Sequence, residues 1–180
     1  PYGACLLGSI NLSRFVKMPF SKNAEIDLSA IEKTTKTAVR FLDNIIEISG
    51  YPLEAQRLEA QRKRRMGLGI TGLADALIFL GLKYGEKDSL NTAEDIMRTI
   101  TYSAYEASSV LAGEKGSFPL FDAEKYASSP FLSILPDEIT GSISKRGIRN
   151  SHLISIAPTG TISLFAGNVN VALVAYDQFG

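Results

Sequence analysis

The sequence has few of the residues that cross-link small domains through disulfides or metal ions, with one cysteine and one histidine in 180 residues. A single cysteine cannot form a disulfide within the chain, and with one histidine it cannot complete the four ligands of a structural zinc site. Disulfide-stapled and zinc-stabilised domains are therefore excluded. We expect no metal site and, because free thiols persist in reducing compartments, a cytoplasmic protein.

Net charge and long apolar runs are also absent. Nineteen Lys and Arg residues balance nineteen Asp and Glu residues, so no overall charge attracts nucleic acid or an anionic membrane. No apolar run approaches the roughly 20 residues of a membrane span. We expect neither nucleic acid nor a membrane as partner, and any anion site must be local.

What the sequence does contain is typical of a globular chain, with 45% hydrophobic and 21% charged residues. We find no internal repeat, low-complexity tract or linker, so we expect residues 1–180 to form a single unit. The chain opens on Pro1 without an initiator Met or a signal peptide. We therefore expect a processed end or the edge of a longer protein.

Hydrophobic periodicity and capping residues predict several helices and two strands, and so a helix-rich α/β fold. Thr92 with Asp95 resembles a capping box, and Gly113 is expected to end that helix, whose apolar stripe is predicted at Ile96, Ile100, Ala104, Ala107 and Leu111. Residues 118–136 are expected to be rich in loops and short elements. The helices are expected over residues 27–50, 53–66, 72–82 and 92–113, and the strands over residues 5–12 and 152–157.

A turn near the end of the chain is a candidate anion site. Pro158-Thr159-Gly160-Thr161 is expected to lead from the second strand into a helix that starts at Ile162 and ends before Gly167. A short turn into a helix start exposes free backbone N–H groups at the positive end of the helix dipole, which suits phosphate. An ordinary capped turn without a ligand fits the same residues equally well.

Gly67-x-Gly69-x-x-Gly72 has the spacing of a dinucleotide-binding fingerprint, but the basic run Arg62-Lys63-Arg64-Arg65 precedes it instead of an apolar strand. We interpret these glycines as sites of close backbone packing and the basic run as the solvated end of a helix. Neither Cys5 nor His152 has a catalytic partner pattern, so on local chemistry both are interpreted as structural.

Five collinear segments together resemble the catalytic subunit of ribonucleotide reductases. Their wording is closest to the adenosylcobalamin-dependent class, and they extend to about Asn170. The segments are CLLGSINL at 5–12, RFLDN at 40–44, RRMGLGITGLAD at 64–75, KGSFP at 115–119 and IAPTGTIS at 156–163.

The resemblance implies part of a ten-stranded α/β barrel, from an enzyme that reduces ribonucleotides to deoxyribonucleotides by radical chemistry. It implies that Cys5 is one of two redox thiols. The family's Asn-x-Cys-x-Glu segment, with the radical cysteine and the general base, and the second redox thiol would lie upstream. We therefore expect this chain alone to be inactive. Residues 171–180 depart from the family pattern, which leaves their role open.

The resemblance also implies that the turn binds the substrate's phosphate, through Pro158, Thr159, Gly160, Thr161 and Ile162. For the parent enzyme it implies adenosylcobalamin, a ribonucleotide substrate, a thioredoxin-like reductant and a homo-oligomer, with no cofactor bound to this chain itself. Two alternatives stay open: a non-catalytic phosphate- or nucleotide-binding module, and a purely structural remnant.

Overall fold

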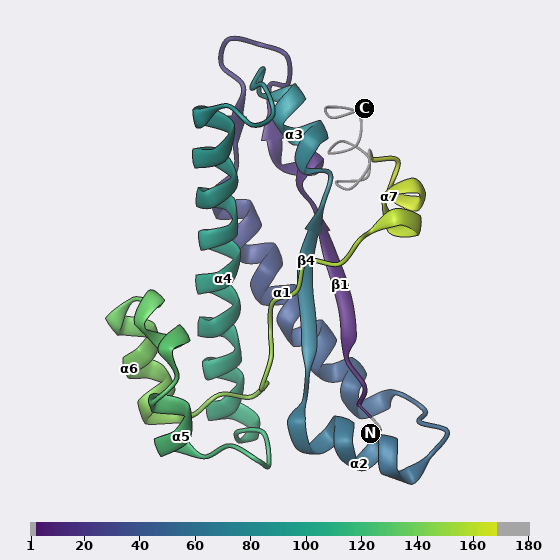
Figure 1. Cartoon of the computed structure of the whole chain (residues 1–180), viewed down its shortest axis with the longest axis vertical. Coiled ribbons are helices and arrows are strands. Elements are labelled where there is room, and N and C mark those ends of the chain that lie inside the picture. Colours follow the sequence, from purple (N-terminus) through teal and green to yellow (C-terminus); the bar gives the residue numbers. More distant parts are fainter. Residues whose placement is uncertain (1–2, 169–180) are drawn as a thin grey trace.

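Two long helices and a pair of parallel strands form the frame of the molecule (Figure 1). The computed structural model describes residues 3–168. The helices are α1 (Leu28–Ile48) and α4 (Lys87–Lys115), and the strands are β1 (Leu6–Asn11) and β4 (Met66–Thr71). Helix α1 lies behind the strands in Figure 1 and α4 stands beside them. The core fills the space between the helices and one face of the strands.

Helix α1 begins and ends as its sequence predicts. The Asp27 carboxylate accepts a hydrogen bond from the Ala30 amide at 2.9 Å and so caps the first turn. The chain leaves the helix at Ser49, just before Gly50 and Pro52. Apolar side chains spaced three or four residues apart form the buried stripe along α1 that packs toward α4. This stripe includes Ile31, Val39, Leu42 and Ile46.

Helix α4 is longer at both ends than the sequence predicts. It begins at Lys87, so Thr92 lies inside the helix and donates its hydroxyl to the Asp88 carbonyl instead of capping the first turn. It also continues through Gly113, because a glycine inside a helix costs only about 1 kcal/mol, and ends at Gly116 with φ 84°. The predicted apolar stripe is buried at Ile96, Ile100, Ala104 and Leu111, whereas its fifth member, Ala107, is half-buried.

Strand β1 was expected from the sequence, whereas β4 was not. The two strands are parallel, with Leu6 opposite Met66 and Asn11 opposite Thr71. Helix α2 (Glu54–Lys63) stops three residues earlier than predicted, at Arg64, which adopts the left-handed conformation with φ 49°. The strand was missed because the glycines that alternate with apolar residues over 66–71, which is a strand period, were interpreted only as sites of close backbone packing between two helices.

The segment that follows residue 151 runs along the other edge of β4. The Leu68 amide donates to the Leu153 carbonyl at 2.7 Å, and the Ser155 amide donates to the Leu68 carbonyl at 3.1 Å. The expected second strand is therefore a single parallel bridge between Leu68 and Ile154. Helix α7 (Gly160–Ala166) follows, starting two residues earlier than predicted and ending before Gly167 as predicted.

The remaining elements are short. A β2–β3 ladder follows β1, and the predicted loop-rich region after α4 holds two short helical elements. The apolar run over 72–82 predicts a helix enclosed on most sides, but α3 is more open than that, since Ile78 is 56% exposed. The bounds are η1 (Leu12–Phe15), β2 (Val16–Lys17), β3 (Glu25–Ile26), α3 (Leu73–Phe79), α5 (Ala123–Ala127), η2 (Pro130–Ile134) and α6 (Asp137–Arg146).

The described residues thus form a helix-rich α/β structure, as predicted, with two two-stranded sheets and no closed barrel among them. Among these same residues, no helix is both long and apolar enough to cross a membrane. Residues 171–180, the predicted divergent tail, lie outside the described part of the chain.

Candidate functional site

The β1–β4 pair has one face toward the core and one face away from it. Side chains alternate along a strand, and Ile10, Leu68 and Ile70 are among those in the core. The opposite face, which we call the open face, therefore carries the alternate residues of both strands. These are Leu7, Ser9, Asn11, Gly67, Gly69 and Thr71. Cys5, one residue before β1, falls on the same side by this alternation.

The glycines of the open face let the chain cross it at very close range. A Cβ atom on Gly69 would lie 2.2 Å from the Ser155 carbonyl oxygen, and one on Gly67 would lie 2.6 Å from Leu7 Cδ2. The prediction of close backbone packing is therefore confirmed. The dinucleotide fingerprint is excluded at this place, because Gly67 and Gly69 lie within β4 and not in a turn between strand and helix.

The segment that crosses the open face at Ser155 leads into the predicted turn at residues 158–161. Thr159 adopts the left-handed conformation with φ 55°. Its side chain is buried, and its hydroxyl oxygen has no hydrogen-bond partner within the described residues. The first helical bond runs from the Ser163 amide to the Thr159 carbonyl at 2.8 Å, which leaves the amides of residues 160–162 without acceptors inside α7. This geometry can receive an anion.

Two polar tethers hold α7 at the ends of the strands. The Thr71 and Ser163 hydroxyl oxygens lie 2.7 Å apart and are both buried. Beyond the helix, the Asn168 side-chain amide donates to the Ser13 hydroxyl at 3.1 Å, and Ser13 donates to the Asn11 side chain at 2.7 Å. Sequence patterns give no signal for these contacts, because the partners are far apart in the chain.

Cys5 is exposed at the opposite end of the strands. Partial burial of the thiol raises its pKa, and the nearby Arg65 charge lowers it in part. Five residue steps of about 3.3 Å along β1 give about 17 Å between its two ends. The structure therefore places Cys5 and α7 on one face without bringing them into contact, since α7 is tethered at Thr71, opposite the last residue of β1.

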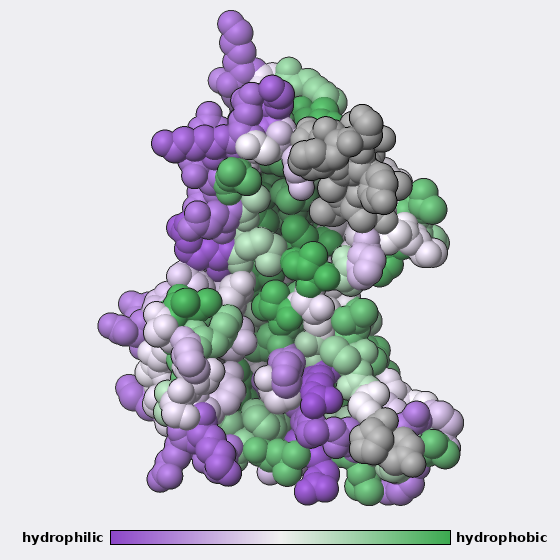
Figure 2. Space-filling model, viewed as in Figure 1, coloured by the Kyte–Doolittle hydropathy of each residue, from purple (hydrophilic) through white to green (hydrophobic). Residues whose placement is uncertain are grey.

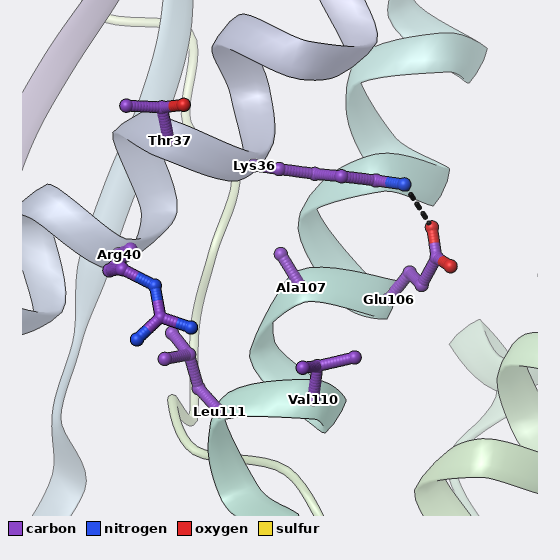
Figure 3. Close-up of a pocket in the computed structure, with 7 residues that line it drawn as sticks. All are labelled: Lys36, Thr37, Arg40, Glu106, Ala107, Val110 and Leu111. Atoms are coloured by element: carbon purple, nitrogen blue, oxygen red, sulfur yellow. Dashed lines mark ion pairs between the residues drawn. The ribbon is translucent and has the colours of Figure 1, made fainter. Parts of the chain in front are cut away.

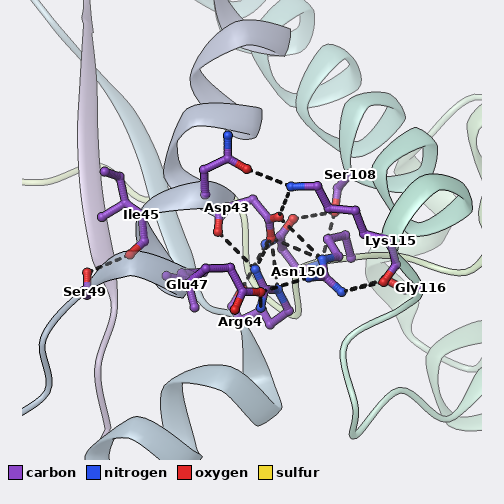
Figure 4. A network of polar contacts seen from close by, with 12 residues as sticks. Asp43, Ile45, Glu47, Ser49, Arg64, Ser108, Lys115, Gly116 and Asn150 are labelled. Atoms are coloured by element: carbon purple, nitrogen blue, oxygen red, sulfur yellow. Dashed lines mark hydrogen bonds and ion pairs between the residues drawn. The ribbon is translucent and has the colours of Figure 1, made fainter.

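A buried ionic cluster, which we call the Asp43 hub, ties the helices together behind this face (Figure 4). Asp43 has no exposed surface. Arg64 donates to its Oδ1 atom from Nε at 3.0 Å and from Nη2 at 2.7 Å, and Asn150 donates to the same atom at 3.0 Å. Burial alone would raise the pKa of Asp43, but the hydrogen bonds and charge of Arg64, with Asn150 and Arg149, hold it below its ordinary value.

The outer part of the hub contains more cations than carboxylates. Lys115 approaches Asp43 at 3.4 Å, and Arg149 and Arg64 both contact Glu47, at 3.2 and 2.5 Å. Arg149 also donates to the carbonyls of Lys115 and Gly116, at 3.0 Å each. The surplus positive charge thus meets the negative end of the α4 dipole. The hub contains no ionised group without a partner.

The hub corrects one prediction and shows one residue that was missed. Arg64 was interpreted as part of a solvated basic run, but its side chain is only 3% exposed. Asp43 is the missed residue: it belongs to the RFLDN segment at 40–44, but no role was predicted for it. Its spacing from Val39 and Ile46 places a carboxylate on the apolar stripe of α1, and a charge on such a stripe indicates a buried partner.

Two of the cavities in the described part of the chain lie away from Cys5 and the turn. One, of about 290 Å³, is lined by α1 and α4, and its charged rim is neutralised by pairs such as Lys36 with Glu106 at 2.8 Å (Figure 3). The other, of about 440 Å³, is lined in part by Tyr105, Tyr126 and His152. Burial raises the pKa of Tyr105 to about 12 and lowers that of His152, with help from Arg65. Neither cavity is lined by Cys5 or the 158–162 turn.

Comparison with known proteins gives a consistent result. A family model described as ribonucleotide reductase, barrel domain, matches residues 1–175. The chain is 38% identical over 167 residues to a vitamin B12-dependent ribonucleoside-diphosphate reductase of Mycobacterium tuberculosis, covering 93% of this chain and 21% of the relative. For the protein of that name from Thermoplasma acidophilum the identity is 37% over 169 residues, covering 93% and 19%.

A third relative is the ribonucleoside-diphosphate reductase large subunit of Arabidopsis thaliana. It is 32% identical over 194 residues, covering 91% of this chain and 23% of the relative. The chain therefore spans about a fifth of the length of the relatives that it matches.

Proposed function

The chain belongs to the ribonucleotide reductase family, in which it matches the barrel domain, and on this premise we propose that it is the part of a ribonucleoside reductase that holds the substrate's phosphate. The whole protein would reduce ribonucleotides to deoxyribonucleotides by radical chemistry. The observation that carries the proposal is the turn before α7, where three backbone amides and the buried Thr159 hydroxyl have no partner inside the helix.

Each residue of the turn has a physical reason to serve a phosphate. Pro158 lacks an N–H group and fixes the backbone angle at which the chain enters the turn. Thr159 and Thr161 offer hydroxyl groups, and Gly160 adds an amide with no side chain in front of it. The amide of Ile162 completes the set that points out of the first helical turn. All these donors are neutral, so the site orients a phosphate more than it attracts one.

Cys5 is proposed as one of the two thiols that reduce the 2′-carbon of the substrate. In that step the two thiols give up two electrons and two protons and form a disulfide, while the 2′-hydroxyl leaves as water. The second thiol is proposed to come from a part of the reductase outside this chain. The exposure of Cys5 supports this proposal, because the disulfide must be reached by a thioredoxin-like reductant after each turnover.

Adenosylcobalamin is proposed as the radical-generating cofactor of the whole reductase, on the strength of the names of two relatives. Within residues 3–168, no group of three or more His, Cys, Asp or Glu side chains could hold a metal ion.

The rest of the reductase or a second copy of the chain is proposed to cover the open face. Large apolar side chains are exposed there and on α7, and Leu7, Leu164 and Phe165 are 55%, 76% and 95% exposed. Figure 2 shows hydrophobic side chains over the centre of this view and on α7, while hydrophilic side chains cover the outer side of α4. Exposed apolar area of this kind favours association. A chain that spans a fifth of its relatives is also proposed to be inactive by itself.

The test is an NMR titration of the 180-residue chain with pyrophosphate. We expect the amides of residues 159–163 to shift, with a dissociation constant of millimolar order, since a few neutral hydrogen bonds give only about −4 kcal/mol. Gly160→Val should abolish these shifts because its side chain blocks backbone approach, whereas Thr159→Ser should retain them. If the largest shifts fall on residues 62–65 instead, the turn is not the phosphate site.

A further inference from the structure

Helix α7 makes a buried polar contact with the last residue of β4. The Thr71 and Ser163 hydroxyl oxygens lie 2.7 Å apart, and the two residues are 1% and 0% exposed. Most of the remaining α7 surface faces outward, as the exposure of Leu164 and Phe165 shows. The orientation of α7 therefore depends on a small number of contacts, of which this pair is fully shielded from water.

We propose that Thr71 is a positioning residue for the phosphate-binding turn and acts through Ser163. The inference rests on the proposed function of that turn. The Ser163 amide closes the first helical hydrogen bond, to the Thr159 carbonyl at 2.8 Å. Ser163 therefore lies one helical turn from Thr159, and its hydroxyl and its amide together fix where the first turn of α7 points.

A second set of contacts keeps α7 attached when the Thr71–Ser163 contact is lost, so a change in the orientation of α7 can be distinguished from its detachment. Asn168 contacts Ser13 at 3.1 Å, and Ser13 contacts Asn11, the last residue of β1. This chain of hydrogen bonds holds the far end of α7 and does not involve Thr71. Removing the Thr71 hydroxyl therefore loosens the phosphate-binding end of α7 while the helix stays attached at its other end.

Thr71→Val tests this with little change of shape, because a methyl group replaces the hydroxyl. The Ser163 hydroxyl is then buried without its partner, which favours arrangements in which α7 tilts away. A ligand that needs the original arrangement binds more weakly in proportion to the fraction that is lost. Thr71→Ser keeps the hydroxyl and should restore binding.

The experiment is a pyrophosphate titration by NMR on the 180-residue chain and its variants. We expect Thr71→Val to weaken binding about tenfold and Thr71→Ser to stay within about twofold of the original chain. Backbone 15N order parameters of residues 160–166, measured without ligand, should fall in Thr71→Val and not in Thr71→Ser. This second measurement reports on α7 directly.

Ser109→Ala is the control, because Ser109 and the half-buried Ser142 form another hydroxyl pair, at 2.8 Å between α4 and α6. It should leave pyrophosphate binding unchanged. Equal weakening in Ser109→Ala and Thr71→Val, or unchanged binding in Thr71→Val, overturns the inference. If the original chain binds no pyrophosphate, the proposed function fails. The positioning role of Thr71 is then decided by the order parameters, and is lost if they do not change.

Discussion

The Asp43 hub and the open face hold the same chain together in opposite ways. At the hub, a fully buried carboxylate accepts hydrogen bonds from Arg64 and Asn150, and its charge is offset by Lys115 and Arg149. At the open face, one hydroxyl pair and one short chain of hydrogen bonds hold α7. Large apolar side chains stay exposed there, and the Thr159 hydroxyl has no partner among the described residues.

This difference separates the region that stabilises the chain from the region that is available for binding. Buried charges are tolerated only where they are paired, so the hub requires every one of its partners. The open face has weakly held elements and unused donors, as expected for a surface that another molecule completes. Substitutions at the hub should therefore change stability most, and substitutions at the open face should change binding most.

The largest expected effect is on the hub. Asp43→Ala leaves buried cations without their carboxylate, and we expect a loss of about 3–5 kcal/mol in the free energy of unfolding. Urea denaturation of the purified chain measures it. Asp95→Ala is the control, because Asp95 is exposed and its pair with Arg98 lies on the surface, where a loss of at most about 1 kcal/mol is expected. Equal losses in the two variants would contradict the role of the hub.

A smaller loss of stability with a larger loss of binding is expected at the open face. Gly69→Val places a Cβ atom 2.2 Å from the Ser155 carbonyl oxygen. The segment around Ser155 that crosses the open face must therefore move. We expect about 1–3 kcal/mol of destabilisation from overpacking, together with loss of pyrophosphate binding. Gly141→Val is the matched control, since a Cβ at Gly141 meets no atom within 4 Å. Unmoved amide signals over 155–163 in Gly69→Val would refute the prediction.

The smallest expected effect concerns the thiol. Exposed Cys5 should react with iodoacetamide in the native chain, although its raised pKa makes it slower than an ordinary cysteine at neutral pH. Arg65→Gln removes the charge that lowers this pKa, so the rate should fall further, by less than about threefold because solvent screens the charge. Arg62→Gln, at an exposed position of the same basic run, should leave the rate unchanged. A reaction that needs denaturant would mean that the thiol is buried.

The sequence predicted the parts of the fold that depend on local chemistry. Asp27 marks the start of α1 correctly because a side-chain cap needs only an amide three residues ahead. The stripe from Ile96 to Leu111 in α4 is buried as its spacing indicates. The capping box at Thr92 was wrong because the preceding turn, from Lys87, is also able to form a helix. Local patterns therefore identified the helices better than their ends.

Contacts between distant residues could not be predicted from such patterns. Strand β4 was missed because its glycines are explained by Ser155, which lies 86 residues after Gly69 in the sequence. The partner of Thr71 is 92 residues away. For the candidate site, the turn at 158–161 and the helix after it were predicted, whereas the two tethers of α7 were not. The roles of Cys5 and of the turn stay predictions.

The hub also has a consequence for the order in which the chain can fold. Asp43 and Arg64 are 21 residues apart in the sequence, but Lys115 is 72 residues from Asp43 and Asn150 is 107 residues from it. Contacts at such separations form slowly, because a long loop must close before they contribute. During synthesis the carboxylate of Asp43 therefore meets its partners one after another. The hub can be complete only after residue 150 has emerged from the ribosome.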